Sequence, residues 1–297
     1  MGRLKTNVCV GMIGVLVLSS LDCGGEEESR RPVEGIMDNS FLIEEAYNQE
    51  PGIVQHIFNG VYSVNRISGT TQRRLDLSFT QEWPAYGQAH QFSYTIPYSI
   101  VKQRTFDPFR GQTDHWDNGI GDVLLNYRYQ VFFDEKTLSG FAPRFSLVLP
   151  TGDEHKGFGN GTLGYQWNLP FSTTFGDRWF AHLNAGLTFL PRAGESPRHD
   201  LLNYNLGASA IYCVNERFNL MLEWVANWNQ GVTGSGEVER QFASVISPGM
   251  RYAFNLAEET QVVVGFAVPI GLNRATPELA GLVYFSVEHR MFGKKAP

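Results

Sequence analysis

The chain lacks any long uninterrupted apolar run after residue 20, and it has few charged residues. A membrane-spanning helix needs about 20 consecutive apolar residues, so a helical membrane protein is excluded. A spanning β-barrel is not excluded, because its strands need only about 10 residues each and one face of each strand is polar. Charged residues make up 18% of the chain and the net charge is -6. Without a basic patch, DNA and RNA are excluded as partners.

Cysteine is also scarce. Cys9 lies in an apolar stretch near the amino terminus, Cys23 follows that stretch, and Cys213 stands alone in the rest of the chain. Neither a disulfide framework nor a cysteine metal site can be built from these residues.

Two predicted loops contain residue types that bind ions in other proteins. Asp107, Asp114, His115 and Asp117 could offer ligands to Ca²⁺, but their spacing is irregular and Glu is missing, so a solvated acidic loop is preferred. The glycines of residues 151–161 lack the strand-to-helix context and the Lys-Ser/Thr pair of a phosphate loop. We therefore expect no metal and no cofactor.

Glycine and aromatic residues are abundant. The chain has 31 Gly and 21 Phe, and aromatic residues reach 13%. This composition favours many short strands and tight turns over helices. A length of 297 residues fits a single all-β barrel.

The stretch from Gly119 to Asp153 shows the strand pattern clearly. Two alternating runs are joined by a polar turn at residues 134–140. Successive side chains of a strand point to opposite faces, so each run has one apolar and one polar side. The first run places Val123, Leu125, Tyr127, Tyr129, Val131 and Phe133 on its apolar side, and Asn126, Arg128 and Gln130 on its polar side.

About a dozen such segments follow Gly52, with alternately short and long connections between them. Outer-membrane barrels have short periplasmic turns and longer external loops, so this alternation is typical of them. The longest predicted loop covers residues 102–119. The predicted strands are Ile53–Asn65, Arg73–Pro84, His90–Val101, Ile120–Phe133, Phe141–Pro150, Leu163–Phe175, Trp179–Leu190, Leu201–Val214, Arg217–Asn229, Val238–Phe254, Thr260–Leu272 and Leu279–Arg290.

The apolar faces of these strands are expected to contact lipid. An open sheet edge in hydrocarbon would leave backbone groups unpaired at several kcal/mol each, so the sheet must close. The sequence therefore predicts an all-β fold over residues 53–297: a transmembrane up-and-down antiparallel β-barrel of about 12 strands, in the lipid of the bacterial outer membrane. Aromatic residues placed to form interfacial girdles are Trp83, Tyr98, Trp167, Trp179, Tyr212, Trp228 and Tyr252.

The amino terminus has the order of an export signal. Basic Arg3 and Lys5 precede an apolar stretch and a cluster of small residues, which predicts a signal peptide over residues 1–25. Cys23 raises the alternative of lipid attachment after cleavage, but Asp22 before it fits such a site poorly.

A periplasmic leader is predicted over residues 26–52. Within it, Ser40 and Glu44 favour the start of a short helix that Pro51 and Gly52 would end. This helix could lie at the periplasmic mouth of the barrel, plug its lumen, or act as an ordered tether.

Charged residues on the polar strand faces are the best functional candidates. Charges inside a pore tune its selectivity, and they must be hydrated or paired. These residues could pair across the lumen or contact a solute directly. The lumen-lining candidates are Arg74, Asp76, Glu82, Arg128, Arg144, Glu223, Arg251, Glu288 and Arg290.

One short motif precedes the first alternating run, and another ends the second run. They are GIGD at Gly119–Asp122 and LPTGD at Leu149–Asp153. Their glycines can take positive φ and their aspartates can accept hydrogen bonds from backbone amides, which predicts structural elements at the barrel rim. The glycines concerned are Gly119, Gly121 and Gly152, and the aspartates are Asp122 and Asp153.

With these motifs, the chain resembles the putative outer-membrane transporter family named for the MetA pathway of phenol degradation. The resemblance extends roughly from Gln55 to Phe292. It implies an outer-membrane barrel associated with the uptake of small, often aromatic or hydrophobic compounds, and it assigns no catalytic residues.

An enzyme is not expected. A His-x-Ser pair, as in outer-membrane phospholipase A, is missing, and so is Gly-x-Ser-x-Gly. The predicted function is a passive outer-membrane channel or facilitator for small solutes. The alternatives are a structural or adhesive barrel with a plugged lumen and, second, a barrel-embedded lipid hydrolase. The oligomeric state is left open.

Overall fold

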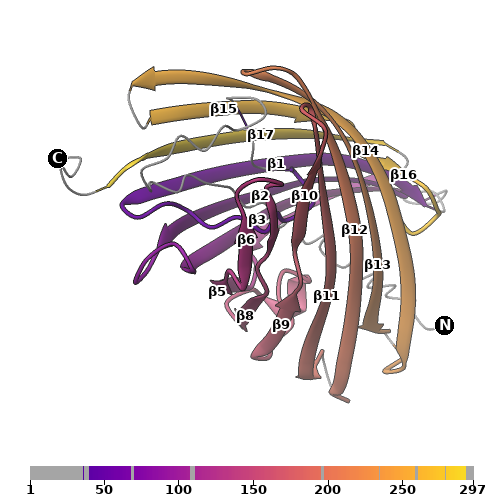
Figure 1. The fold of residues 1–297 in the computed structure, drawn as a ribbon. Helices are drawn as coiled ribbons and strands as arrows, with labels where there is room; N and C mark the ends of the chain where they lie inside the picture. Colours follow the sequence, from indigo (N-terminus) through magenta and orange to yellow (C-terminus); the bar gives the residue numbers. More distant parts are fainter. Residues whose placement is uncertain are drawn as a thin grey trace.

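The computed structural model describes Ile36 and residues 40–67, 70–107, 111–194, 197–233, 235–257, 260–277 and 279–291. Within these ranges, 17 strands form one sheet. The first strand, β1 (Ile53–Ile67), pairs antiparallel with the last, β17 (Leu279–Arg290), so the sheet closes on itself (Figure 1). The result is a closed antiparallel barrel of 12 spanning strands, which confirms the predicted fold class.

The 17 strands reduce to 12 spans because four spans are interrupted. The continuous spans are β1, β2 (Thr70–Pro84), β3 (His90–Asp107), β11 (Trp179–Ala193), β12 (His199–Asn215), β13 (Phe218–Val232), β14 (Val238–Ala257) and β17. The interrupted spans are β4 (Gly111–Ile120) with β5 (Val123–Tyr129) and β6 (Phe132–Asp134); β7 (Ser139–Phe141) with β8 (Arg144–Leu149); β9 (Gly164–Asn168) with β10 (Phe171–Phe175); and β15 (Thr260–Ala267) with β16 (Ile270–Gly271).

Proline explains three of the interruptions. Pro143 lies between β7 and β8, Pro170 between β9 and β10, and Pro269 between β15 and β16. Proline has no backbone N–H to donate to the ladder, so the regular pairing stops there while the chain continues along the wall.

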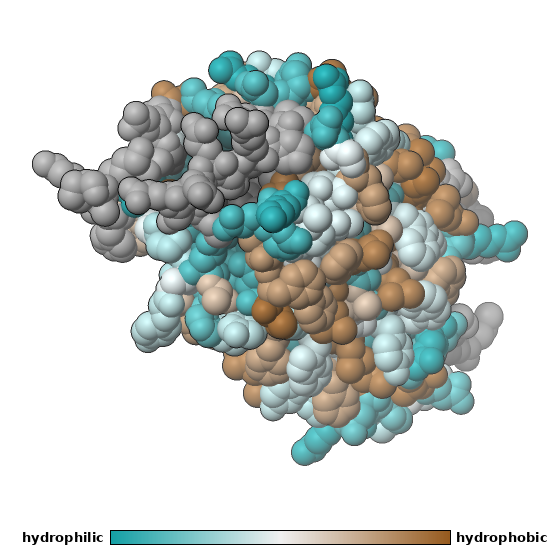
Figure 2. Space-filling model, in the orientation of Figure 1, coloured by the Kyte–Doolittle hydropathy of each residue, from teal (hydrophilic) through white to brown (hydrophobic). Residues whose placement is uncertain are grey.

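The two faces of the wall differ as the alternation predicts. Leu183, Leu222 and Val283 point outward and are 50%, 49% and 55% exposed, while His182 and Glu223 beside them point inward and are buried. Figure 2 shows brown hydrophobic side chains over the middle of the visible face and teal hydrophilic ones toward its margins. An apolar outer surface of this extent is suited to contact with lipid.

Aromatic pairs lie on this outer surface. Trp179 and Tyr212 face each other across neighbouring strands with ring centroids 4.9 Å apart, and both lie close to a strand end. Tyr252 and Phe254 form a second pair at 4.9 Å. These amphipathic rings are placed as interfacial residues of a membrane barrel are.

One side chain of the first predicted hairpin, that of Phe133, points into the barrel instead of toward lipid. Phe133 was expected on the lipid face, but its ring packs 5.8 Å from that of Tyr47 inside the barrel. Val131 and Phe132 are both exposed outward, at 51% and 45%. The break between β5 and β6 thus adds a residue to the outer face, which shifts the inward-outward alternation by one position.

The longest predicted loop is also different. Residues 102–107 and 111–119 belong to strands, because β3 continues to Asp107 and pairs with β4 as a hairpin. Charges on one face hold the two strands together: Arg104 Nε and Lys102 Nζ lie 2.9 and 3.0 Å from Asp114 carboxylate oxygens. Because polar residues occupy both faces of this hairpin, its sequence has no apolar alternation that would reveal it.

The prediction of a helix after Ser40 is wrong. Residues 40–50 contain no helix, and the one helical element among the described residues is the 3-10 helix η1 (Glu154–Lys156). The hydrogen bonds give the reason: Glu44 and Ala46 donate their backbone N–H groups to side chains of the wall instead of to the carbonyls four residues earlier in their own segment. No helix in the described part of the chain is long and apolar enough to cross a membrane.

The outward face predicts a strong effect of charge. Leu222→Arg places a cation on the outer surface between Leu220 and Trp224, and we expect it to lower the free energy of unfolding by about 2–4 kcal/mol. Urea unfolding in lipid vesicles measures the change. Leu222→Met, which keeps the volume, is the control and should change stability by less than about 1.5 kcal/mol. Equal stability of the two variants would contradict a lipid-facing position.

Candidate functional site

Residues 40–49, which precede β1, lie inside the barrel. All residues from Ser40 to Gln49 are buried, none of them more than 6% exposed. We call Ser40–Gln49 the plug segment. It lies nearer to the end of the barrel at which short connections, such as 176–178, join the strands. We call this the short-turn end, and the opposite end the long-loop end.

Side chains of the wall satisfy the backbone of the plug segment. Leu42 and Ile43 donate their N–H groups to Oε1 of Glu223, at 2.7 and 3.2 Å. Glu44 donates to Oδ1 of Asn184 at 2.8 Å, and the Asn184 amide donates back to the Glu44 carbonyl. A segment with no ladder of its own thus leaves few buried backbone groups unpaired. Further donations run from Ala46 N to Ser172 Oγ at 2.8 Å and from Gln49 N to Gln91 Oε1 at 2.6 Å.

A buried carboxylate fixes the centre of the segment. Arg144 Nε lies 3.0 Å from both oxygens of Glu44, and Arg128 Nη1 lies 3.7 Å from Oε1. Asn168 donates a further hydrogen bond to Glu44. All of these groups are within 2% of complete burial. An ion pair in such a place needs several hydrogen bonds to offset its desolvation, and here it has them.

Arg128 binds the backbone of the plug segment directly. Its Nε donates to Asn48 Oδ1 at 2.7 Å and its Nη1 to the Glu45 carbonyl at 3.0 Å, while Nη2 donates to the Tyr47 carbonyl. A guanidinium presents its donors in a planar fork, which matches the arrangement of these three acceptor oxygens.

Apolar contacts fill the other side of the lumen. The Phe41 ring packs 5.1 Å from that of Tyr284 on β17. A Cβ at Gly265 would collide with Phe41, and one at Gly207 would collide with Ile43. The absence of side chains at these wall positions makes room for the plug segment. Because its polar side contacts β5, β8 and β11 and its apolar side contacts β15 and β17, the segment bridges the lumen.

The other lumen-lining candidates make different contacts. Arg74 and Asp76 form a half-exposed pair, Nε to Oδ1 2.7 Å, away from the plug segment. The remaining four are Glu82, which accepts from Gln91 at 2.8 Å; Arg251, which donates to Asn219 at 2.9 Å and to the Ile36 carbonyl at 3.3 Å; and Glu288 and Arg290, which are half-buried near the end of β17 opposite Gln55 and Ile53.

Several site residues are not among the candidates from the sequence. Glu44 lies in the segment predicted to be a helix, and the inward amides Asn168 and Asn184 carry no charge that would have selected them. Ser172 and His182 face each other on β10 and β11, Oγ to Nδ1 2.7 Å. Because the Ser172 hydroxyl also accepts the Ala46 N–H and both side chains are buried under the plug segment, this pair has no access to a lipid substrate. Inward polar positions at neighbouring strand registers were the signal that could have found them.

The predicted rim motifs do meet. The carboxylate of Asp122 accepts hydrogen bonds from Gly152 N at 3.0 Å and from the backbone and side-chain nitrogens of Asn160 at 2.8 Å. Asp153 caps η1 by accepting from His155 N at 3.0 Å. The aspartates therefore act on backbone amides as predicted.

The glycines of these motifs serve a different purpose from the one expected. Gly119, Gly121 and Gly152 are not among the residues with positive φ. They allow close approach instead: a Cβ at Gly121 would lie 2.8 Å from Cγ of Pro97, and one at Gly119 would lie 2.9 Å from the Phe158 ring. The motifs thus dock the long connection 150–163 on the wall.

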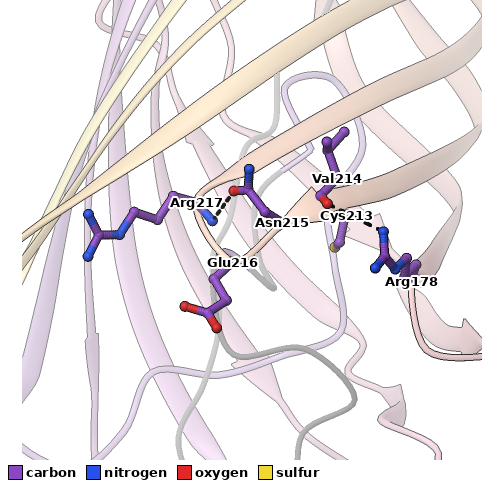
Figure 3. Close-up of a pocket in the computed structure, with 6 residues that line it drawn as sticks. All are labelled: Arg178, Cys213, Val214, Asn215, Glu216 and Arg217. Carbon is purple, nitrogen blue, oxygen red and sulfur yellow. Dashed lines mark hydrogen bonds between the residues drawn. The ribbon is translucent and has the colours of Figure 1, made fainter.

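An open pocket lies at the short-turn end (Figure 3). Its shape comes from a turn held by Arg178 Nη1 donating to the Val214 carbonyl at 3.4 Å and by Arg217 N donating to Asn215 Oδ1 at 2.9 Å. Ile36 N donates to the Glu216 carbonyl at 3.2 Å, so Ile36 is bonded to one of the residues that line the pocket. The lining residues are Arg178, Cys213, Val214, Asn215, Glu216 and Arg217.

Comparison with known proteins bears on the fold. No family model and no curated protein matches the chain. Its structure is similar to that of the COG4313 outer membrane channel from Pseudomonas putida F1, with a TM-score of 0.56 and 12% identity over 81% of this chain and 96% of that one. It is also similar to the transport unit of the autotransporter AIDA-I from Escherichia coli, with a TM-score of 0.51 and 10% identity over 82% and 91% of the two chains. The chain folds as a bacterial outer-membrane β-barrel.

The rim contacts give a test of loop docking. Asp122→Ala removes the acceptor of three hydrogen bonds, so we expect connection 150–163 to detach and trypsin to cleave after Lys156 several-fold faster in the membrane-embedded protein. Limited proteolysis followed by mass spectrometry measures the rate. The control, Asp153→Ala, loses only the cap of η1 and should be cleaved more slowly than Asp122→Ala. The same rate in both variants would contradict the docking role.

Proposed function

We propose that this protein is a passive channel for small solutes across the outer membrane, and that the plug segment closes it. The observation that carries the proposal is the way the segment is held. Side chains of the wall bind it, while no backbone ladder joins it to the sheet. A segment held in this way can leave without breaking the wall.

The fold supports this proposal. A closed barrel with an apolar exterior and polar inward positions on most strands is the architecture of a passive pore. The structural similarity to a protein described as an outer membrane channel agrees with it. The resemblance of the GIGD and LPTGD motifs to the MetA-pathway family suggests small aromatic or hydrophobic compounds as solutes.

Energetics favour the closed state. A neutral hydrogen bond contributes about 0.5–1.5 kcal/mol net, and bonds to charged groups about 1.5–3 kcal/mol. The contacts of Glu44, Arg128 and Glu223 together make displacement of the segment costly. The open state would then be a minor population, and a solute or a change in the segment would have to favour it.

Displacement would also change the charge of the lumen. Arg128 makes its hydrogen bonds to the plug segment, and the wall partners of Arg144 are the neutral Asn126, Ser146 and Gln166. When Glu44 leaves with the segment, these two cations lose their closest carboxylate. An open pore of this kind is expected to favour anionic solutes.

The second candidate function is a structural or adhesive barrel with a permanently plugged lumen. Its support is the complete burial of Arg128, Arg144 and the plug segment, since a filled lumen offers no path for a solute. The two candidates differ in whether the segment can leave.

Conductance in planar bilayers separates the two candidates. Glu44→Arg puts a third cation beside Arg128 and Arg144. Losing one partner of a buried pair costs about 3–5 kcal/mol, which corresponds to a shift of roughly 10²- to 4 × 10³-fold toward the open state. We expect short, rare openings from the natural protein and frequent openings from the variant. Glu135→Arg, the same charge change in an exposed turn, should behave as the natural protein does. A folded Glu44→Arg barrel without current would establish the plugged barrel instead.

Ion selectivity tests the lumen charges in a pore opened without a change of charge. Gly265→Val should displace Phe41 and open the pore, whereas Gly281→Val, with no atom within 4 Å, should not. In a KCl gradient, the reversal potential of Gly265→Val should show a preference for chloride, and adding Arg144→Gln should reduce that preference. A cation preference in Gly265→Val would contradict the proposed role of Arg128 and Arg144.

A further inference from the structure

Two histidines meet on the outer wall where the barrel closes. His56 on β1 and His289 on β17 lie diagonally across the ladder, since His56 is opposite Val287 and His289 is opposite Val54. Their Nε2 atoms are 3.1 Å apart, and their rings are nearly parallel, with centroids 5.2 Å apart and an interplanar angle of 22°. Both side chains are half-buried, and they lie near the start of β1 and the end of β17, at the short-turn end of the barrel.

The surroundings fix the orientation of both rings. Nδ1 of His289 lies 3.1 Å from the Arg290 carbonyl, and a carbonyl can only accept, so this nitrogen carries the proton. The lone pair of His289 is therefore on Nε2, which points at His56. The His56 ring stacks on Phe79, with an interplanar angle of 9°. A histidine that donates its other N–H to a backbone carbonyl has the arrangement found for metal ligands.

We propose that His56 and His289 form a two-histidine site for a divalent first-row transition metal on the outer wall. With metal–nitrogen bonds of about 2.0–2.1 Å, nitrogens 3.1 Å apart subtend about 100° at the ion. This angle lies between the square-planar value of about 90° and the tetrahedral value of about 109°, so the spacing of the two nitrogens suits one ion once the rings turn to direct both lone pairs at it. Binding requires the His56 proton to shift from Nε2 to Nδ1.

Water completes the coordination in this site. The described residues contain no group of three His, Cys, Asp or Glu side chains that could hold a metal. Two imidazoles select borderline metals over Ca²⁺ and Mg²⁺, and the affinity should follow the usual order, with Cu²⁺ above Ni²⁺ and Zn²⁺.

The position of the site links metal binding to barrel closure. The two histidines are 233 residues apart in sequence, and they meet because the first and last strands pair. An ion that binds the folded barrel and not the unfolded chain stabilises the folded state. A metal here would join the first and last strands of the barrel, which pair side by side without a loop between them.

Spectroscopy of the refolded full-length barrel in detergent micelles tests the proposal. With one equivalent of Cu²⁺, we expect an electron paramagnetic resonance spectrum with two imidazole nitrogens, and with Zn²⁺ a higher unfolding temperature on heat-shift electrophoresis. His289→Gln should weaken Cu²⁺ binding at least tenfold and remove the Zn²⁺ effect. His115→Gln, which changes a side chain that is 70% exposed in the β3–β4 hairpin, is the matched control and should retain both.

Two outcomes would overturn the site. One is a spectrum of the natural protein without two imidazole nitrogens, a result that does not depend on the folding of any variant. The other is an equal loss of binding in His115→Gln and His289→Gln. If His289→Gln fails to refold, His56→Gln provides the same comparison from the other strand.

Discussion

Pairing of backbone hydrogen-bond groups is the constraint on which both the wall and the interior of this barrel depend. In hydrocarbon every N–H and C=O must find a partner within the protein, which forces the sheet to close between β1 and β17. The plug segment faces the same demand inside the lumen and meets it differently. Its amides bind Glu223, Asn184 and Ser172, so side chains there do what a neighbouring strand does in the wall.

The wall could be predicted from the sequence because its physical signal is local. Alternation of apolar and polar residues, as from Phe218 to Trp224, reports a half-buried strand directly, and the connections report where each strand ends. The failures occur where that signal is lost. The β3–β4 hairpin is polar on both faces. The extra residue at Val131–Phe132 exchanges the inward and outward faces of the strand, and both residues are apolar, so the sequence pattern does not reveal the change. The positions of Pro143, Pro170 and Pro269 could have located the interruptions.

The candidate site could be predicted only in part. Strand phase was enough to select Arg128, Arg144 and Glu223 as inward residues, because a charge on the lipid face is excluded. The common partner of the two arginines could not be found in this way. Glu44 lies in a segment whose local pattern favours a helix, and tertiary contacts more than 100 residues away along the chain decide its conformation instead. Pairing of wall charges with each other was one of two expectations, and Arg74 and Asp76 form such a pair. Arg128 and Arg144 instead pair with Glu44 of the plug segment.

Closure between the first and last strands has a consequence for assembly. The plug segment precedes β1, yet Phe41 packs on Tyr284 of β17, so its complete binding site exists only after the carboxy-terminal strand has taken its place. Contacts this distant in sequence form late in folding, because a long loop must close before they contribute any stability. The plug segment is therefore synthesised before the strands of the barrel and becomes ordered after them. During assembly the unfilled lumen would be a transient open state of the same barrel.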